Sequence, residues 1–221
     1  MGKLDNKAAI VTGATSGMGR AIALLFAREG AAVLANGRNQ ERGKRVVEEI
    51  RSLGGKAEFV AGDVAREQTN LSLVQECIGR FGKVDVVVTN AGQLGLGSVT
   101  EVSVDLWKQT LSVNLESVFY LVRSAIPEMK RHGGGSIVVN GSIAAFKGFP
   151  QHAAYCASKG ALLSLVRQVA IDYGPSIRIN LLCPGPVDTP LVWDSAAAFP
   201  DPPGAVSAPA RKTILNRPGP P

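Results

Sequence analysis

Short apolar runs of strand length alternate with longer segments of helical period along most of this chain. The strand-like runs show little polar alternation, which is typical of strands buried on both faces. This alternation predicts one α/β domain, a doubly wound parallel sheet between two layers of helices. The predicted strands are 8–12, 32–36, 57–61, 84–89, 136–140 and 177–183, and the predicted helices are 20–29, 41–53, 70–81, 106–131 and 153–173.

The composition excludes several classes of protein. A chain of 221 residues, 45% hydrophobic, is large enough to bury one sizeable core. The net charge of +6 is scattered and aromatic residues make up only 5%, so we expect no nucleic-acid partner. No apolar run approaches the roughly 20 residues that cross a bilayer, and we expect no signal peptide or membrane partner. Cys77, Cys156 and Cys183 lack metal-ligand spacing, which suggests a metal-free protein of the reducing cytoplasm.

A glycine-rich segment joins the first predicted strand to the first predicted helix. Residues 12–19 contain the spacing Gly-x-x-x-Gly-x-Gly, from Gly13 to Gly19. Glycine permits a tight turn and lets backbone N–H groups approach a pyrophosphate, while the helix N-terminus favours an anion. The segment therefore predicts a dinucleotide-binding loop. A loop that serves only close packing is the alternative interpretation.

The residues after the second predicted strand bear on the choice of dinucleotide. An acidic residue there would bind the adenosine ribose and repel a 2′-phosphate. Residues 36–39 read Asn-Gly-Arg-Asn and hold no acid, and the guanidinium of Arg38 suits a 2′-phosphate. We therefore expect NADP(H) to be favoured, with NAD(H) possible. Arg38 stacked on adenine, or facing solvent, is the alternative.

Tyr155 and Lys159 stand four residues apart in the predicted helix 153–173, and Ser142 precedes them. Residues at this spacing share one helix face, so the phenol and the ammonium can point at the same place. A neighbouring cation favours the phenolate, and free tyrosine titrates near about 10. Beside a phosphate-binding loop, the pair predicts a proton-transfer site. Without that loop, a partly exposed helix face would explain it.

Together these motifs resemble the short-chain dehydrogenase/reductase family over nearly the whole chain. The similar segments are the loop 12–19, Asp63 and Val64 after the third predicted strand, Asn90-Ala91-Gly92 after the fourth, the tetrad Asn114, Ser142, Tyr155 and Lys159, and the loop 184–190 after the sixth.

The resemblance implies a Rossmann-like fold and an NADP(H)-dependent oxidoreductase that interconverts a carbonyl and a secondary alcohol. Tyr155 would transfer the proton, Lys159 would lower its pKa and bind the nicotinamide ribose, and Ser142 would hold the substrate oxygen. Asn114 would support a water chain, and Thr189 would bind the carboxamide. The implied cofactor contacts are Gly13, Ser16, Gly17, Met18, Gly19, Arg38, Asp63, Val64, Asn90, Ala91, Gly92, Tyr155, Lys159, Pro184, Gly185, Val187 and Thr189.

The sequence leaves the small-molecule substrate open. Five residues are predicted walls of an apolar substrate pocket: Gln93, Leu94, Phe146, Leu191 and Trp193.

His152 could touch substrate, although an exposed loop histidine is the interpretation that we prefer. Cys156 is expected to face the core. A serine hydrolase is disfavoured, because no Gly-x-Ser-x-Gly elbow surrounds Ser142.

The last part of the chain differs in composition. From Asp194 onward Pro, Ala and Gly dominate, which predicts a mobile loop. We divide the chain into a dinucleotide-binding and catalytic domain, 1–190, and a substrate loop with a short tail, 191–221.

The family usually continues with a further helix and a seventh strand, which we expect to be missing here. Strand 177–183 would then be an uncovered apolar edge. We expect a homodimer through helices 106–131 and 153–173 rather than a tetramer. The chain is interpreted as either a fragment or a natural short form, and a non-catalytic cofactor-binding or interaction protein is the alternative function.

Overall fold

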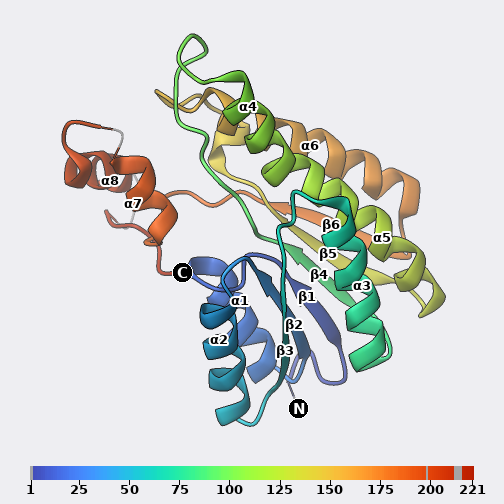
Figure 1. The fold of residues 1–221 in the computed structure, drawn as a ribbon. Coiled ribbons are helices and arrows are strands. Elements are labelled where there is room, and N and C mark those ends of the chain that lie inside the picture. The colour runs from blue at the N-terminus through green and yellow to red at the C-terminus, as the bar shows by residue number, and fades with distance from the viewer. Residues whose placement is uncertain (1, 198, 212–215) are drawn as a thin grey trace.

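Six parallel strands form a single sheet in the order β3-β2-β1-β4-β5-β6 (Figure 1). The computed structural model describes residues 2–197, 199–211 and 216–221. The sheet order reverses between β1 and β4, as in doubly wound Rossmann-like folds, and confirms the predicted fold class. The strands are β1 Ala8–Val11, β2 Ala32–Gly37, β3 Lys56–Ala61, β4 Val86–Thr89, β5 Gly135–Asn140 and β6 Ile177–Leu182.

Helices cover the sheet from both sides. In Figure 1, α1 and α2 lie against one face, and α3, α5 and α6 lie against the other. The helices are α1 Gly17–Arg28, α2 Gln40–Ser52, α3 Glu67–Phe81, α4 Val104–Leu111, α5 Ser117–Arg131, α6 Ala153–Tyr173, α7 Pro190–Ala196 and α8 Pro202–Arg211, with a π-helical turn at Ser112–Glu116 and a 3-10 turn at Ile143–Ala145.

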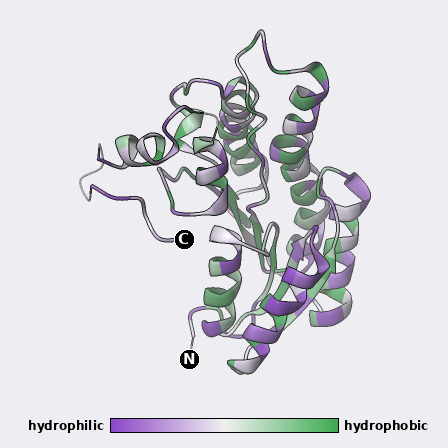
Figure 2. Cartoon of the chain, turned by 60° about the vertical axis from the view of Figure 1, so that its left-hand side comes forward, coloured by the Kyte–Doolittle hydropathy of each residue, from purple (hydrophilic) through white to green (hydrophobic). Residues whose placement is uncertain are grey.

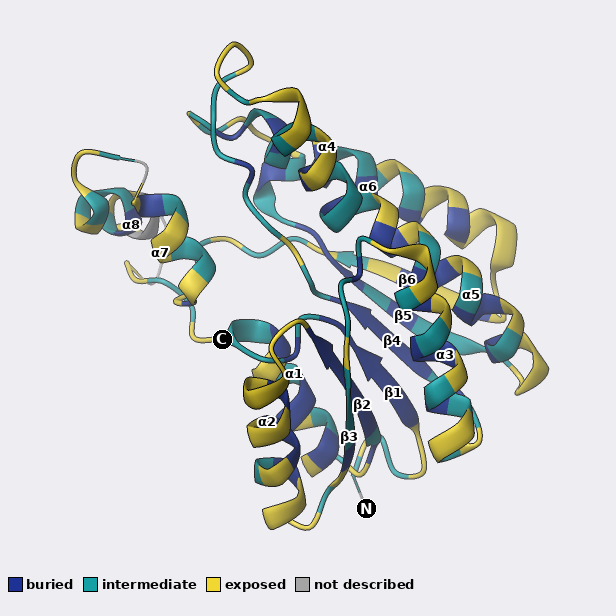
Figure 3. Ribbon diagram, viewed as in Figure 1, coloured by how far each residue is buried: buried dark blue, intermediate teal, exposed yellow. Residues whose placement is uncertain are grey.

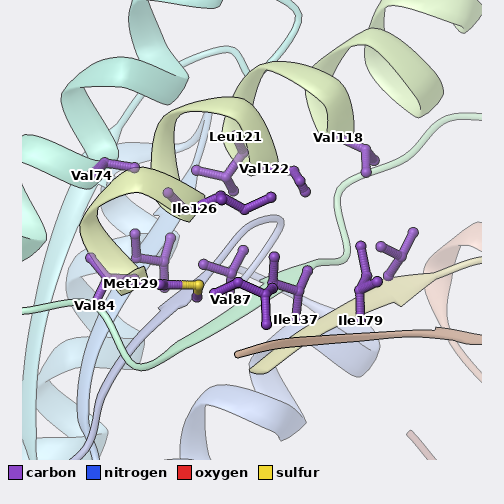
Figure 4. Packing of buried hydrophobic residues seen from close by; sticks show 14 of the residues in the cluster. Val74, Val84, Val87, Val118, Leu121, Val122, Ile126, Met129, Ile137 and Ile179 are labelled. Atoms are coloured by element: carbon purple, nitrogen blue, oxygen red, sulfur yellow. The ribbon is translucent and has the colours of Figure 1, made fainter. Parts of the chain in front are cut away.

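Alternate residues of each strand enter two separate cores. In β1, Ala9 and Val11 pack with α1 and α2, whereas Ala8 and Ile10 pack on the opposite face. Figure 4 shows that second core, where Leu121 and Met129 of α5 point toward strand residues such as Val87. The strands are largely buried and the outer helix faces are exposed and hydrophilic (Figures 2 and 3). Burial on both faces explains why the strand sequences show little polar alternation.

The predicted strands and helices are confirmed, and their ends differ by at most three residues. The predicted helix 106–131 differs in its interior, because a π-helical turn at Ser112–Glu116 separates α4 from α5. Among the described residues, no helix is long and apolar enough to span a bilayer.

The segment after Asp194 is not the loop that its composition predicts. Residues 194–196 complete α7, and α8 follows at Pro202–Arg211. Both helices begin with proline, which fits the first turn because the missing N–H has no intrahelical partner there. Alanine, the best helix former, recurs in α8, whose sequence is PPGAVSAPAR. The end of the chain returns to the loop after β6, where the N–H of Asp188 donates to the carbonyl of Gly219 at 2.9 Å.

Strand β6 is the outermost strand at one edge of the sheet, as expected. Ile177 and Ile179 pack into the core beside α6, while the alternate residues Arg178, Asn180 and Leu182 are exposed. The prediction of an apolar uncovered edge is therefore only partly right, because two of the three exposed side chains are polar. Polar edge residues discourage strand addition by another chain.

Candidate active site

A cavity of about 340 Å³ lies at the carboxyl ends of the strands, where the sheet order reverses. We call it the polar cavity, because about half of its lining is polar. The loops after β1, β2, β3 and β4 meet there, so residues far apart in the sequence share one wall. The predicted residues that line it are Gly13, Ser16, Gly17, Met18, Arg38, Asp63, Val64, Asn90, Ala91, Gly92, Tyr155, Lys159 and Thr189.

The glycine-rich loop is shaped by close contacts. Gly13 and Gly17 have φ of +64° and +49°, in the left-handed region that favours glycine. Gly19 does not line the cavity, because it packs inside the turn. A Cβ there would lie 2.2 Å from the Gly13 carbonyl oxygen. The amide of Asn90 donates to the carbonyls of Thr12 and Gly13 at 3.2 and 3.3 Å, so Asn90 holds the loop from the neighbouring strand.

Two arginines, one after β2 and one in α2, line the polar cavity. Arg38 follows β2 directly, and Arg42 joins it from the first turn of α2. Asn39 caps α2 by accepting a hydrogen bond from the N–H of Arg42 at 2.8 Å, which sets the start of that helix. Sequence reasoning missed Arg42. Its signal is the Asn39 cap, which places Arg42 in the first helical turn.

Ser142 and Tyr155 come together beside the polar cavity. Ser142 precedes the 3-10 turn, and Tyr155 lies in the first turn of α6. Burial raises the pKa of Tyr155, and a hydrogen bond with Ser142 acts in the opposite direction. The expectation that the Tyr155 pKa is lowered is therefore wrong for the protein alone, because burial disfavours the phenolate more than its neighbours favour it.

Lys159 lies one helical turn after Tyr155, as the spacing predicts. Its Nζ stands 5.6 Å from the centre of the Tyr155 ring and donates to the carbonyl of Asn140 at 2.8 Å. Its residue is only 4% exposed. Burial lowers the pKa of Lys159 to about 8. Asn140, which sequence reasoning missed, also donates its amide to Asn90 at 2.9 Å and so links the lysine to the glycine loop.

Asn114 lies in the π-helical turn and braces the loop after β4. Its Oδ1 accepts from the N–H of Gln93, and its Nδ2 donates to the Gln93 carbonyl and to Ser158 Oγ, each at 2.9 Å. A Cβ on Gly92 would lie 3.4 Å from Asn114 Oδ1 and 3.8 Å from Lys159 Nζ. Both side chains therefore lie on the side of Gly92 that a Cβ would occupy. π-Helical turns like the one that holds Asn114 are frequent at functional sites.

A second cavity, of about 380 Å³, adjoins the first and is mostly apolar. Tyr155 and Thr189 line both cavities. Helices α7 and α8 supply the far wall of the second, and these helices extend beyond the sheet in Figure 1. Ser142, Pro184, Gly185 and Val187 line this cavity and not the polar one, and Met18 of the glycine-rich loop lines both.

Only part of the predicted substrate wall is found in the apolar cavity. Leu94 and Leu191 line it, whereas Gln93 lines the polar cavity. Phe146 is 66% exposed, and Trp193, 46% exposed, donates its indole N–H to Asp188 at 2.9 Å. Neither Phe146 nor Trp193 lines the apolar cavity, because both side chains face outward. Missed wall residues include Phe149, Val192, Ser195, Phe199 and Val206.

His152 is not the exposed loop histidine that we preferred. It is 6% exposed and lines the apolar cavity. Its Nε2 lies 2.9 Å from Ser195 Oγ of α7, and its ring stacks on Phe199. Ser195 of α7 and Phe199, which follows that helix, cover His152. The sequence around His152 gives no indication of these contacts. Cys156 is half-buried rather than part of the core.

A glycine-rich loop at the switch point of a parallel sheet, beside a buried Tyr–Lys pair, defines a dinucleotide-binding α/β enzyme. The family model described as short chain dehydrogenase matches residues 7–198. The chain belongs to the short-chain dehydrogenase family, and it is an NAD(P)-dependent oxidoreductase of alcohol and carbonyl groups.

Relatives of this chain include proteins named as dehydrogenases. A 3beta-hydroxysteroid dehydrogenase of Mediterraneibacter gnavus is 44% identical over 199 residues, which is 89% of this chain and 72% of that protein. A cyclopentanol dehydrogenase of Comamonas testosteroni is 37% identical, covering 98% of this chain and 86% of the relative. A crystal structure of a putative NAD(P)-dependent gluconate 5-dehydrogenase from Beutenbergia cavernae, with NADP bound at low occupancy, has a TM-score of 0.90 at 37% identity and covers 98% of this chain and 85% of that one.

Proposed function

We propose that this protein interconverts a carbonyl and a secondary alcohol with NADP(H) as the favoured coenzyme, and with Tyr155 as the group that donates or accepts the proton. One observation carries the proposal. Tyr155 stands at the boundary between a polar cavity built around the glycine-rich loop and an apolar cavity suited to an organic substrate.

The residues of the polar cavity fit a dinucleotide. The left-handed glycines Gly13 and Gly17 shape a turn that a pyrophosphate can approach closely. Ser16, the residue before α1, makes no side-chain capping bond, and the first turn holds no acidic residue, so the helix N-terminus suits an anion. When bound, the coenzyme supplies the hydride chemistry.

Two arginines support the preference for NADP(H). Arg38 and Arg42 line the polar cavity at the end of β2, where an acidic residue would mark a preference for NAD(H). Guanidinium groups make strong charge-assisted contacts with phosphate. The NADP bound to the Beutenbergia cavernae relative agrees with this assignment.

The protein groups around the substrate oxygen would act together. Because burial raises the pKa of Tyr155, the phenol carries its proton at neutral pH and can donate it to a carbonyl oxygen during reduction. Ser142 would hydrogen-bond the same oxygen and stabilise the charge that develops on it. Lys159 would place a positive charge beside the phenol. Asn114 would hold the loop at Gly92 in place, and Thr189, between the two cavities, would contact the nicotinamide end.

The test follows the absorbance of the reduced coenzyme with a panel of alicyclic ketones. Tyr155→Phe is expected to lower kcat by about 10²- to 10⁴-fold, the usual contribution of a general acid, while calorimetry shows unchanged coenzyme binding. Tyr173→Phe, at the far end of the same helix, is the matched control and should retain full activity. Equal activity of Tyr155→Phe and wild type would refute the proton role. Dinucleotide binding by wild type with no turnover would favour a non-catalytic binding protein.

A further inference from the structure

Two polar side chains of the apolar cavity, His152 and Ser195, are not among the proposed proton-transfer residues. Tyr155 and Thr189 line both cavities, and Ser142 lines the apolar one. His152 and Ser195 line only the apolar cavity. The other described residues of that cavity are mostly apolar, among them Leu94, Phe149, Val192, Phe199 and Val206. A few placed polar groups in an apolar pocket usually fix the orientation of a ligand.

The position of His152 is built by several contacts. The ring lies edge-on to Phe149 and Tyr155, with centroids 6.2 and 6.0 Å away, and it stacks on Phe199 at 6.5 Å. The preceding residue, Gln151, has φ of +60°, an uncommon conformation for a residue other than glycine. A hydrogen bond from the N–H of Gly97 to the Gln151 carbonyl, at 2.8 Å, holds that turn.

Hydrogen bonding assigns the protons of the pair. His152 Nδ1 lies 2.6 Å from the Pro150 carbonyl oxygen, which can only accept, so Nδ1 carries a hydrogen. In the neutral ring Nε2 is then an acceptor, and Ser195 Oγ, 2.9 Å away, donates its proton to it. The serine oxygen keeps two lone pairs but has no proton left to offer. The pair can therefore accept a hydrogen bond from a ligand hydroxyl, whereas a ligand carbonyl would find no donor.

We infer that His152 and Ser195 form a specificity-determining pair that accepts a hydrogen bond from a second hydroxyl of the substrate, on a carbon other than the reacting one. The substrate class is a compact apolar ketone or secondary alcohol that carries one further hydroxyl. The inference rests on the proposed function, because it takes Tyr155 as the site of reduction. The inference adds to that function the second substrate group that the apolar cavity selects.

Three bicyclic ketones test the pair: 2-decalone, its derivative with a hydroxyl at carbon 6, and decalin-2,6-dione. With NADPH, wild type is expected to show kcat/KM about 3- to 10-fold higher for the hydroxyketone than for the other two, as one neutral hydrogen bond provides. Ser195→Ala should bring the hydroxyketone to within about twofold of 2-decalone, through a rise in KM. His152→Phe leaves the Ser195 proton free to donate, and it should reduce the preference for the hydroxyketone over the dione.

Ser207→Ala in α8 is the matched control, because Ser207 donates to the Gly204 carbonyl and does not line the cavity. It should keep the wild-type ratios. Equal losses on all three ketones in Ser195→Ala would overturn the inference and leave the pair as a contact that only holds α7 in place.

The two proposals fail in different ways. Tyr155→Phe should stop reduction of all three ketones, whereas the Ser195 variant changes only their ratio. If wild type reduces none of them, calorimetric binding of the three ketones to the NADPH complex makes the same comparison. Equal affinities in wild type and Ser195→Ala would then overturn the inference.

Discussion

Lys159 carries an ammonium group that the fold removes almost completely from water. Burial lowers its pKa from 10.5 to about 8, and the carbonyl of Asn140 is its hydrogen-bond acceptor. A buried charge of this kind destabilises the folded state, because its hydration is only partly replaced. Its retention beside Tyr155 fits a group kept for chemistry rather than for stability.

The burial of Lys159 predicts a gain in stability on its removal. Below about pH 8 the lysine is charged in both states and destabilises the folded protein fully. As the pH rises toward 10.5, the unfolded state binds more protons than the folded one, so the penalty fades. Lys159→Met should raise the free energy of unfolding at pH 7 by roughly 2–3 kcal/mol, with a smaller gain near pH 10.

Urea unfolding at the two pH values checks this prediction. Lys130→Met, on the exposed surface of α5, is the control and should change little. A loss of stability in Lys159→Met at pH 7 would show that the bond to Asn140 outweighs the burial of charge. The same variant is expected to lose activity.

Arg38 and Arg42 predict how the coenzyme preference can be changed. Arg38→Asp replaces a phosphate-binding group with one that repels phosphate and can bind ribose hydroxyls. It should lower kcat/KM with NADPH by roughly 10- to 100-fold and favour NADH, as expected for a hydrogen bond to a charged group. Steady-state kinetics with both coenzymes provides the measurement. Arg45→Asp, on the exposed side of α2, should leave the ratio as it is. An unchanged ratio in Arg38→Asp would exclude Arg38 as the selector.

At the scale of elements, the turn from β1 into α1 depends on close backbone approach. A Cβ at Gly19 would lie 2.2 Å from the Gly13 carbonyl oxygen and 2.4 Å from Asn90 Nδ2, closer than real atoms come. Gly19→Ala should therefore open the turn, weaken dinucleotide binding at least tenfold and destabilise the fold by about 1–3 kcal/mol.

Calorimetry of dinucleotide binding and thermal unfolding test the Gly19 variant. Gly79→Ala in α3 is the opposite case, since a Cβ there meets nothing within 4 Å. Removing a glycine from a helix interior should stabilise the protein by about 0.5–1 kcal/mol. Similar behaviour of the two variants would mean that the crowding around Gly19 is not what limits the turn.

The long helical segment 106–131 shows how far apolar periodicity predicts an element. The apolar repeat correctly places helix 106–131, but it continues unchanged through the π-helical turn at Ser112–Glu116. Asn114 in that turn is held by Gln93 and Ser158, which lie far away in the sequence. Local periodicity holds no record of such partners, so the turn could not be predicted.

The whole molecule has an open sheet edge at β6, whose exposed face mixes Arg178 and Asn180 with Leu182. The two polar side chains interrupt what would otherwise be an apolar strip able to pair with another chain. The homodimer through α5 and α6 stays a prediction. Exposed Phe119 and Ile171 lie on those helices and suit a contact surface.

The polar side chains of β6 predict an effect on association. Replacing Arg178 and Asn180 together with valine should cause concentration-dependent association without loss of native secondary structure. Light scattering over a range of concentrations and circular dichroism check this. Arg45→Val on α2 is the control for loss of one surface charge and should not associate further. If the double variant stays as dispersed as wild type, the edge is protected by something other than these side chains.

Features that depend on neighbouring residues could be predicted from the chain alone. Strand and helix order follow from apolar periodicity, the dinucleotide loop follows from glycines after the first strand, and Tyr155 and Lys159 meet because four residues make about one helical turn. Each rests on backbone geometry that acts over a few residues. The proline and alanine residues after Asp194 led to the wrong prediction of a loop, because proline in the first turn of a helix, as at Pro202 of α8, is compatible with that helix.

Other features exist only because distant segments pack together. The raised pKa of Tyr155 needs burial under several elements, and the proton assignment at His152 needs Ser195 of α7. Leu181 turns toward the core while Arg178 and Asn180 face outward, which depends on the sheet register. Desolvation and long-range hydrogen bonds are set by which segments meet in space. The pattern of the chain therefore predicts a dinucleotide-binding loop and a Tyr–Lys proton-transfer pair, while packing decides the pKa of Tyr155 and which residues close the apolar cavity.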